Sequence, residues 1–260
     1  EFVRHNAVFQ DYTLTSDSGL SVEVNIRRPR NFTKPRPLVI ILGGYGTGRR
    51  ATELVDSEQD AVIVSLNYPY EGDRRMEGIS LLFNIPHVQQ ALFDIAPATM
   101  LTLDYLLQQP YVDHQQVELA GVSLGAFVAA IPGAMDTRVT RVWLVQGAGD
   151  PKALFAYRLE KSIGSPWWRD KVAGLIALIG NVHHLTPERW VGRISPRPVI
   201  AVNSRQDVTF PPGTVKALHD AIKEPREIIW IEGEHVRPSR HNVVRQLTDI
   251  VLSRVDQGMN

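Results

Sequence analysis

Ser123 lies at the centre of Gly-Val-Ser-Leu-Gly, residues 121–125, between two apolar stretches. The spacing Gly-x-Ser-x-Gly is typical of a tight turn from a strand into a helix, which exposes the serine Oγ as a nucleophile at the helix N-terminus. A serine also begins many helices as an N-cap, so the pentapeptide by itself leaves two interpretations open. The apolar run 117–122 before it and the helix-forming residues after it favour the nucleophile.

A serine hydroxyl attacks a carbonyl only when a base takes its proton and an acid orients that base. Asp207 closes the stretch 197–207, and His235 closes the stretch 226–235. Of the eight histidines, His235 alone follows a predicted strand with a glycine just before it. The chain order Ser, Asp, His places all three at the C-terminal ends of parallel strands, where open α/β sheets bind ligands. Asp150, after an earlier strand, is an alternative acid.

The glycine-rich stretch Gly-Gly-Tyr-Gly-Thr-Gly, residues 43–48, allows close approach of the backbone to a ligand. A phosphate-binding loop would end in Lys-Ser or Lys-Thr, which this stretch lacks, and no acid closes the next strand to bind a ribose. The better interpretation is an oxyanion hole built from two backbone N–H groups. We expect these donors to be Leu124 and Tyr45, with the backbone of Gly44 close to the substrate.

The alternation of apolar strands with helices predicts an α/β fold with a mostly parallel sheet and helices on both faces. Two alternating stretches around Gly19 predict an N-terminal hairpin, and continuous β-branched runs predict strands buried on both faces. The expected strands lie at 38–42, 61–68, 117–122, 139–150, 197–207 and 226–235, and the expected helices at 88–109, from 124 onward, at 212–223 and at 239–255.

Residues 151–195 interrupt this alternation, since they contain two helical stretches, three tryptophans and no clear strand. An insertion between two strands of such a sheet lies over the strand ends, so we interpret the segment as a cap or lid. An ordinary crossover with surface aromatics is the alternative. The substrate pocket is then expected to be lined by Tyr70, Phe83, Trp167 and Trp168, whose alternative role is core packing.

The composition excludes several classes of protein and site. The 28 basic and 28 acidic residues give no net charge, which argues against nucleic acid as a partner bound through bulk charge. The absence of cysteine excludes disulfides, zinc–thiolate sites and a thiolate nucleophile. No apolar stretch approaches the about 20 residues of a membrane span. Because the sequence begins at Glu1 without methionine, we interpret it as a processed chain or one with residues left from cloning, and expect a soluble protein in the cytoplasm or, after signal removal, outside it.

With these motifs the chain resembles the α/β-hydrolase superfamily, and within it the serine carboxylesterase and dienelactone-hydrolase-like branch. The resemblance is carried by LGGYG at 42–46, GVSLG at 121–125, Asp207 in NSRQD and His235 in EGEH. It implies Ser123 as nucleophile, His235 as base and Asp207 as acid.

The resemblance further implies an α/β-hydrolase fold in a single domain, residues 1–260, with 151–195 as a small helical cap. It implies hydrolysis of a small carboxylic ester through an acyl-enzyme, with no metal and no organic cofactor. Two features depart from the family pattern: Gly43 stands where many members have histidine, and the cysteine nucleophile of dienelactone hydrolases proper is absent. An acyltransferase or thioesterase, a serine peptidase and an inactive binding protein are the alternatives, and the oligomeric state stays open.

Overall fold

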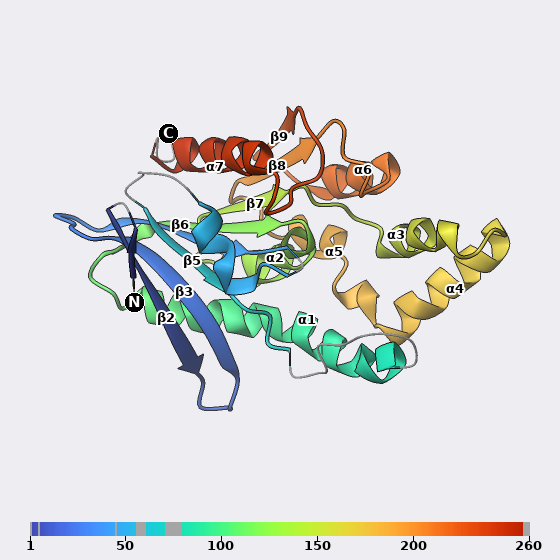
Figure 1. Cartoon of the computed structure of the whole chain (residues 1–260), viewed down its shortest axis with the longest axis horizontal. Coiled ribbons are helices and arrows are strands. Elements are labelled where there is room, and N and C mark those ends of the chain that lie inside the picture. The colour runs from blue at the N-terminus through green and yellow to red at the C-terminus, as the bar shows by residue number, and fades with distance from the viewer. Residues whose placement is uncertain (1, 5, 45, 56–60, 71–79, 257–260) are drawn as a thin grey trace.

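The computed structural model describes residues 2–4, 6–44, 46–55, 61–70 and 80–256, with the backbone alone for 80–85 and 256 (Figure 1). Within these residues a nine-stranded sheet carries helices on both of its faces. The α/β class predicted from the sequence is confirmed.

The strands lie across the sheet in the order β1 (Phe2–Arg4), β2 (Ala7–Thr15), β3 (Ser21–Pro29), β5 (Val62–Leu66), β4 (Arg36–Leu42), β6 (Val112–Val122), β7 (Arg141–Val145), β8 (Val199–Ser204) and β9 (Arg226–Ile231). The first three are antiparallel to their neighbours, and β2 and β3 form the predicted hairpin. From β5 to β9 the strands run parallel, as predicted. Their C-terminal ends therefore meet at one edge of the sheet.

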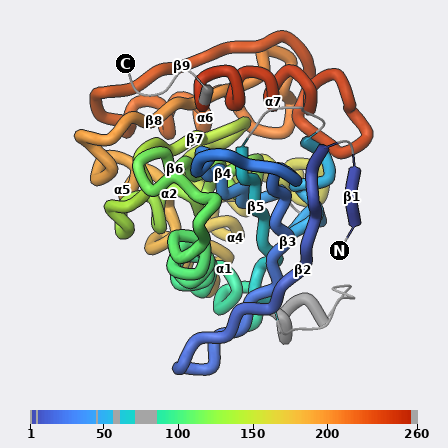
Figure 2. The backbone as a smooth tube through the Cα atoms, turned by 90° about the vertical axis from the view of Figure 1, so that its left-hand side faces the viewer, coloured from blue at the N-terminus to red at the C-terminus, as the bar shows by residue number. Residues whose placement is uncertain are grey.

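Helices cover the two faces of the sheet from opposite sides (Figure 2). One face packs against α1 (Ser80–Leu106), α2 (Leu124–Met135), α5 (Pro187–Val191) and α6 (Pro212–Ala221). The other packs against α7 (His241–Asp256), with the short 3₁₀ helix η1 (Gly48–Leu54) beside it. Alternate residues of a strand supply the two cores, so Leu119 belongs to the first and Ala120 to the second.

The described residues of the connection from β4 to β5 contain little helix. Parallel neighbours are joined by a crossover that is usually an α-helix. Between Leu42 and Val62, the described residues form only η1. Less helical surface therefore covers β4 and β5 on the α7 face than a full crossover helix provides.

Residues 151–195 connect β7 to β8 through α3 (Pro151–Arg158), η2 (Leu159–Lys161), α4 (Pro166–Ile179), η3 (Val182–His184) and α5. In Figure 1, α3 and α4 extend away from the sheet, whereas α5 packs on α2. The segment is described throughout and contains helices without a strand, as its sequence predicts. Its role as a cap stays a prediction.

Helix α1 begins earlier than the helix predicted for 88–109, since it spans Ser80–Leu106. Pro86 and Pro97 lie inside it. Proline has a very unfavourable helix propensity, so it obscures the helical pattern of the first turns.

Candidate active site

The turn at Ser123 joins β6 directly to α2. Ser123 has φ 55° and ψ −111°, a conformation that costs on the order of 1–3 kcal/mol for a residue with a side chain. A Cβ at Gly121 would collide with the carbonyl oxygen of Gly125, and a Cβ at Gly125 would collide with that of Leu42. The Ser123 N–H donates to the carbonyl oxygen of Val145 at 2.9 Å. The two glycines and this bond hold the serine at the C-terminal edge of the sheet.

The structure brings Ser123, His235 and Asp207, hereafter the candidate triad, together from the ends of three strands. Ser123 Oγ lies 2.7 Å from His235 Nε2, and His235 Nδ1 lies 2.7 Å from Asp207 Oδ2. His235 follows β9 and Asp207 follows β8, so the pairing of these strands sets their separation. The side chains of His235 and Asp207 are only 9% and 5% exposed. The result is a buried hydrogen-bonded chain that ends on a serine hydroxyl.

The partners of Asp207 decide where the protons of this chain lie. Burial raises the pKa of the Asp207 carboxyl, but the hydrogen bonds from His235 and from the Thr209 N–H (2.7 Å) outweigh it and hold the pKa below its usual range. A carboxylate only accepts hydrogen bonds, so His235 Nδ1 carries a hydrogen and donates it. Nε2 is then an acceptor for the Ser123 hydroxyl, which is the arrangement in which imidazole acts as a base.

Gln146, directly after β7, is a candidate positioning residue that the sequence motifs did not reveal. Its Nε2 donates to Ser204 Oγ and to the carbonyl oxygen of Glu234 (3.4 Å), and its Oε1 accepts from the Val236 N–H. This one buried side chain therefore ties the loop of His235 to the ends of β7 and β8. The available signal was a polar residue immediately after a buried strand.

Arg240 holds the same loop from its other side. Its Nη1 donates to the carbonyl oxygen of His235 at 2.6 Å, and its Nη2 pairs with the carboxylate of Glu234. The Phe210 ring lies at right angles to the His235 imidazole, with 5.1 Å between ring centroids. The imidazole is thus fixed through its backbone and through an aromatic contact.

The loop after β4 approaches the serine through Gly44. A Cβ at Gly44 would lie 3.4 Å from Ser123 Cβ, in ordinary van der Waals contact, so the loop lies directly against the serine. The carbonyl oxygen of Gly43 accepts from the Tyr68 hydroxyl, and that of Gly44 from Thr47 Oγ1, each at 2.8 Å. Burial raises the pKa of Tyr68 well above its usual range, so its hydroxyl stays a donor. Hydrogen bonds to these two carbonyl groups therefore fix the orientation of the loop.

One of the two predicted oxyanion-hole donors lies in the described part of the chain. Leu124 is the first residue of α2, so its N–H has no acceptor within the helix and adds to the positive end of the helix dipole. The first turn of α2 holds no acidic side chain that would compete for this end. Tyr45, the other expected donor, lies outside the described residues.

Asp150, the alternative acid, makes different contacts. It is the N-cap of α3, where its Oδ1 accepts from the Ala153 N–H at 3.1 Å, and its own N–H donates to Glu188. Its side chain is exposed. Of the two aspartates, Asp207 is the one that the structure brings to His235.

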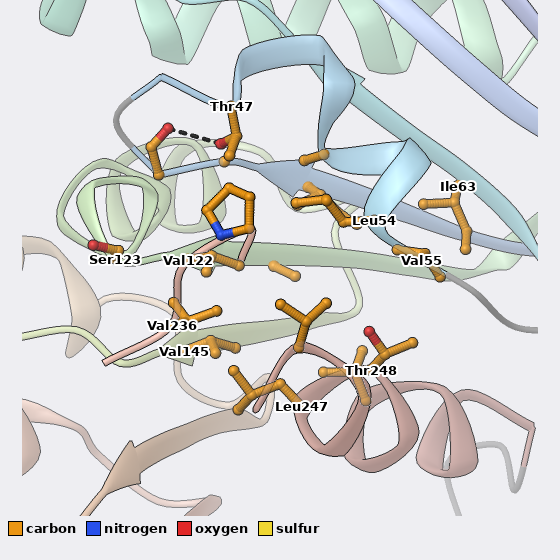
Figure 3. Close-up of a pocket in the computed structure, with 18 of the residues that line it drawn as sticks. Thr47, Leu54, Val55, Ile63, Val122, Ser123, Val145, Val236, Leu247 and Thr248 are labelled. Carbon is orange, nitrogen blue, oxygen red and sulfur yellow. Dashed lines mark hydrogen bonds between the residues drawn. The ribbon is translucent and has the colours of Figure 1, made fainter. Parts of the chain in front are cut away.

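A cavity of about 290 Å³ begins at Ser123 and His235 and runs between the sheet and α7 (Figure 3). Strands β4 to β7, η1, the loop after β9 and α7 contribute to its wall, and most of the lining side chains are aliphatic. Gly44, which was expected near the substrate, is among the lining residues.

Three of the four aromatic residues predicted for the substrate pocket do not line this cavity. Trp167 and Trp168 are on α4, with 60% and 57% of their surface exposed. Tyr70 lines a separate depression between β3 and α1. The side chain of Phe83 lies outside the described residues. Contact of these four with a substrate stays a prediction, since aliphatic residues of the sheet and α7 line the cavity at Ser123 instead.

Among the described residues, no group of three or more His, Asp and Glu side chains is placed to hold a metal ion. Nor is any helix in the described ranges long and apolar enough to cross a membrane.

Comparison with solved structures identifies the fold. The chain is similar to the α/β hydrolase GrgF from Penicillium sp. sh18, with 16% identity, a TM-score of 0.63 and coverage of 97% of this chain and 99% of that one. It is also similar to the acetyl xylan esterase from Paenibacillus sp. R4, with 16% identity, a TM-score of 0.68 and coverage of 96% of this chain and 86% of that one. An esterase of Pyrococcus furiosus is similar as well, with 13% identity, a TM-score of 0.66 and coverage of 98% of this chain and 92% of that one. No family model and no curated protein matches the sequence. The chain therefore has the α/β-hydrolase fold that its motifs predicted.

Proposed function

We propose that the protein is a serine hydrolase that cleaves carboxylic esters through an acyl-enzyme intermediate. The observation that carries the proposal is the hydrogen-bonded chain from Asp207 through His235 to Ser123, with 2.7 Å at each step. A serine hydroxyl is a weak nucleophile, and such a chain is what activates it. The likeness of the fold to two esterases supports the same assignment.

In the first half of the proposed reaction, Ser123 Oγ attacks the carbonyl carbon of the ester while its proton moves to His235 Nε2. The carbonyl oxygen becomes an oxyanion, for which the N–H groups of Leu124 and Tyr45 are the proposed donors, each worth about 3–4 kcal/mol. The tetrahedral intermediate then expels the alcohol, which takes the proton from His235. The Asp207 carboxylate, kept ionised by its lowered pKa, stabilises the imidazolium.

In the second half, a water molecule takes the place of the alcohol. His235 removes a proton from the water, and the oxygen attacks the acyl carbon. Ser123 then leaves and recovers its proton from His235. The products are a carboxylic acid and free enzyme, so the proposed cycle is complete without a cofactor.

Hydrolysis of p-nitrophenyl acetate and butyrate by the wild type, Ser123→Ala and His235→Ala tests the proposal. Loss of either side chain is expected to lower kcat by about 10⁴-fold or more, while circular dichroism shows an intact fold. A fluorophosphonate is expected to label the peptide that contains Ser123. A Ser123→Ala variant with wild-type turnover would contradict the proposal.

A pair of aspartate variants tests the assignment of the acid. Asp207→Asn removes the carboxylate that orients His235, so kcat is expected to fall by about 10⁴-fold. Asp150→Asn is the matched control, and it is expected to keep wild-type kcat because Asp150 caps α3 away from the histidine. A larger loss in Asp150→Asn would reverse the assignment.

A further inference from the structure

The cavity beside Ser123 is apolar beyond its entrance. Its titratable lining residues in the described part of the chain are His235 and the exposed Arg237. Figure 3 shows the cavity extending from Ser123 towards Ile63 on one wall and Thr248 of α7 on the other. A group that enters deeply is therefore in contact with aliphatic side chains.

Two features of the chain leave this space open. The β4–β5 connection supplies only η1 in its described residues, where a longer crossover helix is usual. The wall also contains the small residues Ala51 of η1 and Ala120 of β6. Ile41 and Val122, apolar residues on two central strands, face this open space and are therefore only partly buried.

We infer that this cavity is the acyl-chain pocket, and that the preferred substrates are esters of unbranched aliphatic acids of about eight to ten carbons. The inference rests on the proposed ester hydrolysis, because it takes Ser123 as the point at which the acyl group is attached. A preformed apolar cavity of about 150 Å³ holds one benzene ring. By that measure, the cavity of about 290 Å³ accommodates roughly ten carbon atoms. An acetyl group would leave most of it empty.

The direction of the bound acyl chain follows from the same geometry. Ser123 and His235 both line the cavity, so an acyl group bonded to Ser123 Oγ lies beside it, and because Figure 3 shows this oxygen turned away from the aliphatic lining, the acyl group has to bend back to enter. Its aliphatic tail then passes between the sheet and α7. The helical segment 151–195 contributes no lining residue to this path.

The test measures kcat/KM for p-nitrophenyl esters from acetate to dodecanoate. Each methylene buried in the pocket is expected to raise kcat/KM by up to about fourfold, with a maximum near octanoate or decanoate. Thr248→Trp then shortens the pocket, because half-buried Thr248 faces the cavity from α7. The ratio of kcat/KM for octanoate to that for acetate is expected to fall about 60-fold, the effect of three lost methylenes.

Gln246→Trp is the matched control for the bulky substitution. Gln246 lies on the same helix, but it is exposed and does not line the cavity. This variant is expected to keep the wild-type ratio for octanoate over acetate. Melting temperatures of both tryptophan variants check that each one is folded at the assay temperature.

Calorimetry measures octanoate binding to Ser123→Ala, with and without Thr248→Trp, and so tests the pocket independently of ester hydrolysis. Octanoate is expected to bind Ser123→Ala, and to bind the double variant far more weakly. Hydrolysis with a flat or falling chain-length profile would overturn the pocket and leave the proposed function standing. Octanoate binding without any ester hydrolysis would overturn the proposed function and leave the pocket, whereas the absence of both overturns both.

Discussion

Replacing Gln146 with methionine tests whether one buried amide keeps His235 in position for catalysis. Methionine has a similar volume, so the substitution removes hydrogen bonds without opening a large cavity. Gln146 has no exposed surface. The substitution takes away the partner of Ser204 Oγ and of the Val236 N–H. The loop of His235 then loses its side-chain link to the end of β7.

The size of the effect follows from these bonds. A net hydrogen bond contributes about 0.5–1.5 kcal/mol, and a buried donor left without a partner costs about 1–3 kcal/mol. Loss of the Ser204 bond together with an orphaned Val236 N–H is therefore expected to lower the free energy of unfolding by about 2–4 kcal/mol. A displacement of about 1 Å at a catalytic group lowers the rate on the order of 10²-fold, so we expect that loss in kcat of Gln146→Met.

Asn203→Leu is the matched control for this experiment. Asn203 is also a buried amide near these strand ends, but it bonds to the Gly147 carbonyl (3.0 Å) and to His219 (2.9 Å). The variant is expected to lose similar stability and to keep kcat. Urea denaturation measures stability, and p-nitrophenyl ester hydrolysis is assayed at a temperature at which both variants are folded. Equal losses of kcat in the two variants, or wild-type kcat in Gln146→Met, would refute the reasoning.

Three further predictions concern stability. Burial raises the pKa of Asp136, but the bonds from the Arg138 guanidinium, 2.6 and 2.9 Å long, outweigh it and lower the pKa. A folded-state pKa below the unfolded value stabilises the protein above about pH 4, and that contribution is lost as the pH falls through the folded-state pKa. Asp136→Asn is thus expected to be about 1.5–3 kcal/mol less stable than wild type at neutral pH, with a difference that shrinks in acid; a difference independent of pH in urea denaturation would contradict this. Gly174 lies inside α4, and a Cβ added there would have its nearest neighbour at 3.7 Å. Because glycine destabilises a helix interior relative to alanine, Gly174→Ala is expected to raise the free energy of unfolding by about 0.5–1 kcal/mol. Gly125→Ala is expected to destabilise the protein through collision with Leu42, and unchanged urea midpoints for both glycine variants would show that neither argument holds.

The candidate triad could be predicted because its signals are local. A strand buried on both faces is a continuous apolar run, and a polar residue just after it lies at a known edge of a parallel sheet. Asp207 follows such a run, His235 follows the apolar run of β9, which the structure shows to be an exposed edge strand, and the glycines on either side of Ser123 mark the turn. Asp150 satisfied the same local rule, and only the three-dimensional contacts separated it from Asp207.

The cavity and the role of Gln146 could not be predicted, because they depend on residues far apart in the chain. Gln146 bonds to Val236, 90 residues later, and nothing in the local sequence specifies that partner. The cavity lies beside a crossover whose described residues form only the short helix η1, and two of its wall residues are alanines. Trp167 and Trp168 were predicted to line the pocket because they lie in the segment expected to be a cap, and α4 carries them away from the sheet (Figure 1), so their contact with a substrate stays a prediction.

Strands β7 and β8 are hydrogen-bonded neighbours, although the whole helical segment 151–195 lies between them in the chain. The strand spacing of about 4.8 Å, and not the length of the connection, therefore sets the distance between the loops at the sheet edge. Within this segment, α3 and α4 extend away from the sheet, so changes on their exposed faces leave Ser123 and His235 in place, whereas α5 packs on α2 and belongs to the core. The acyl pocket has no such freedom, because its walls are core residues of the sheet and α7. Adaptation of this pocket to a new acyl chain would therefore alter the core and with it the folding stability, whereas changes on the exposed faces of α3 and α4 leave the core unchanged.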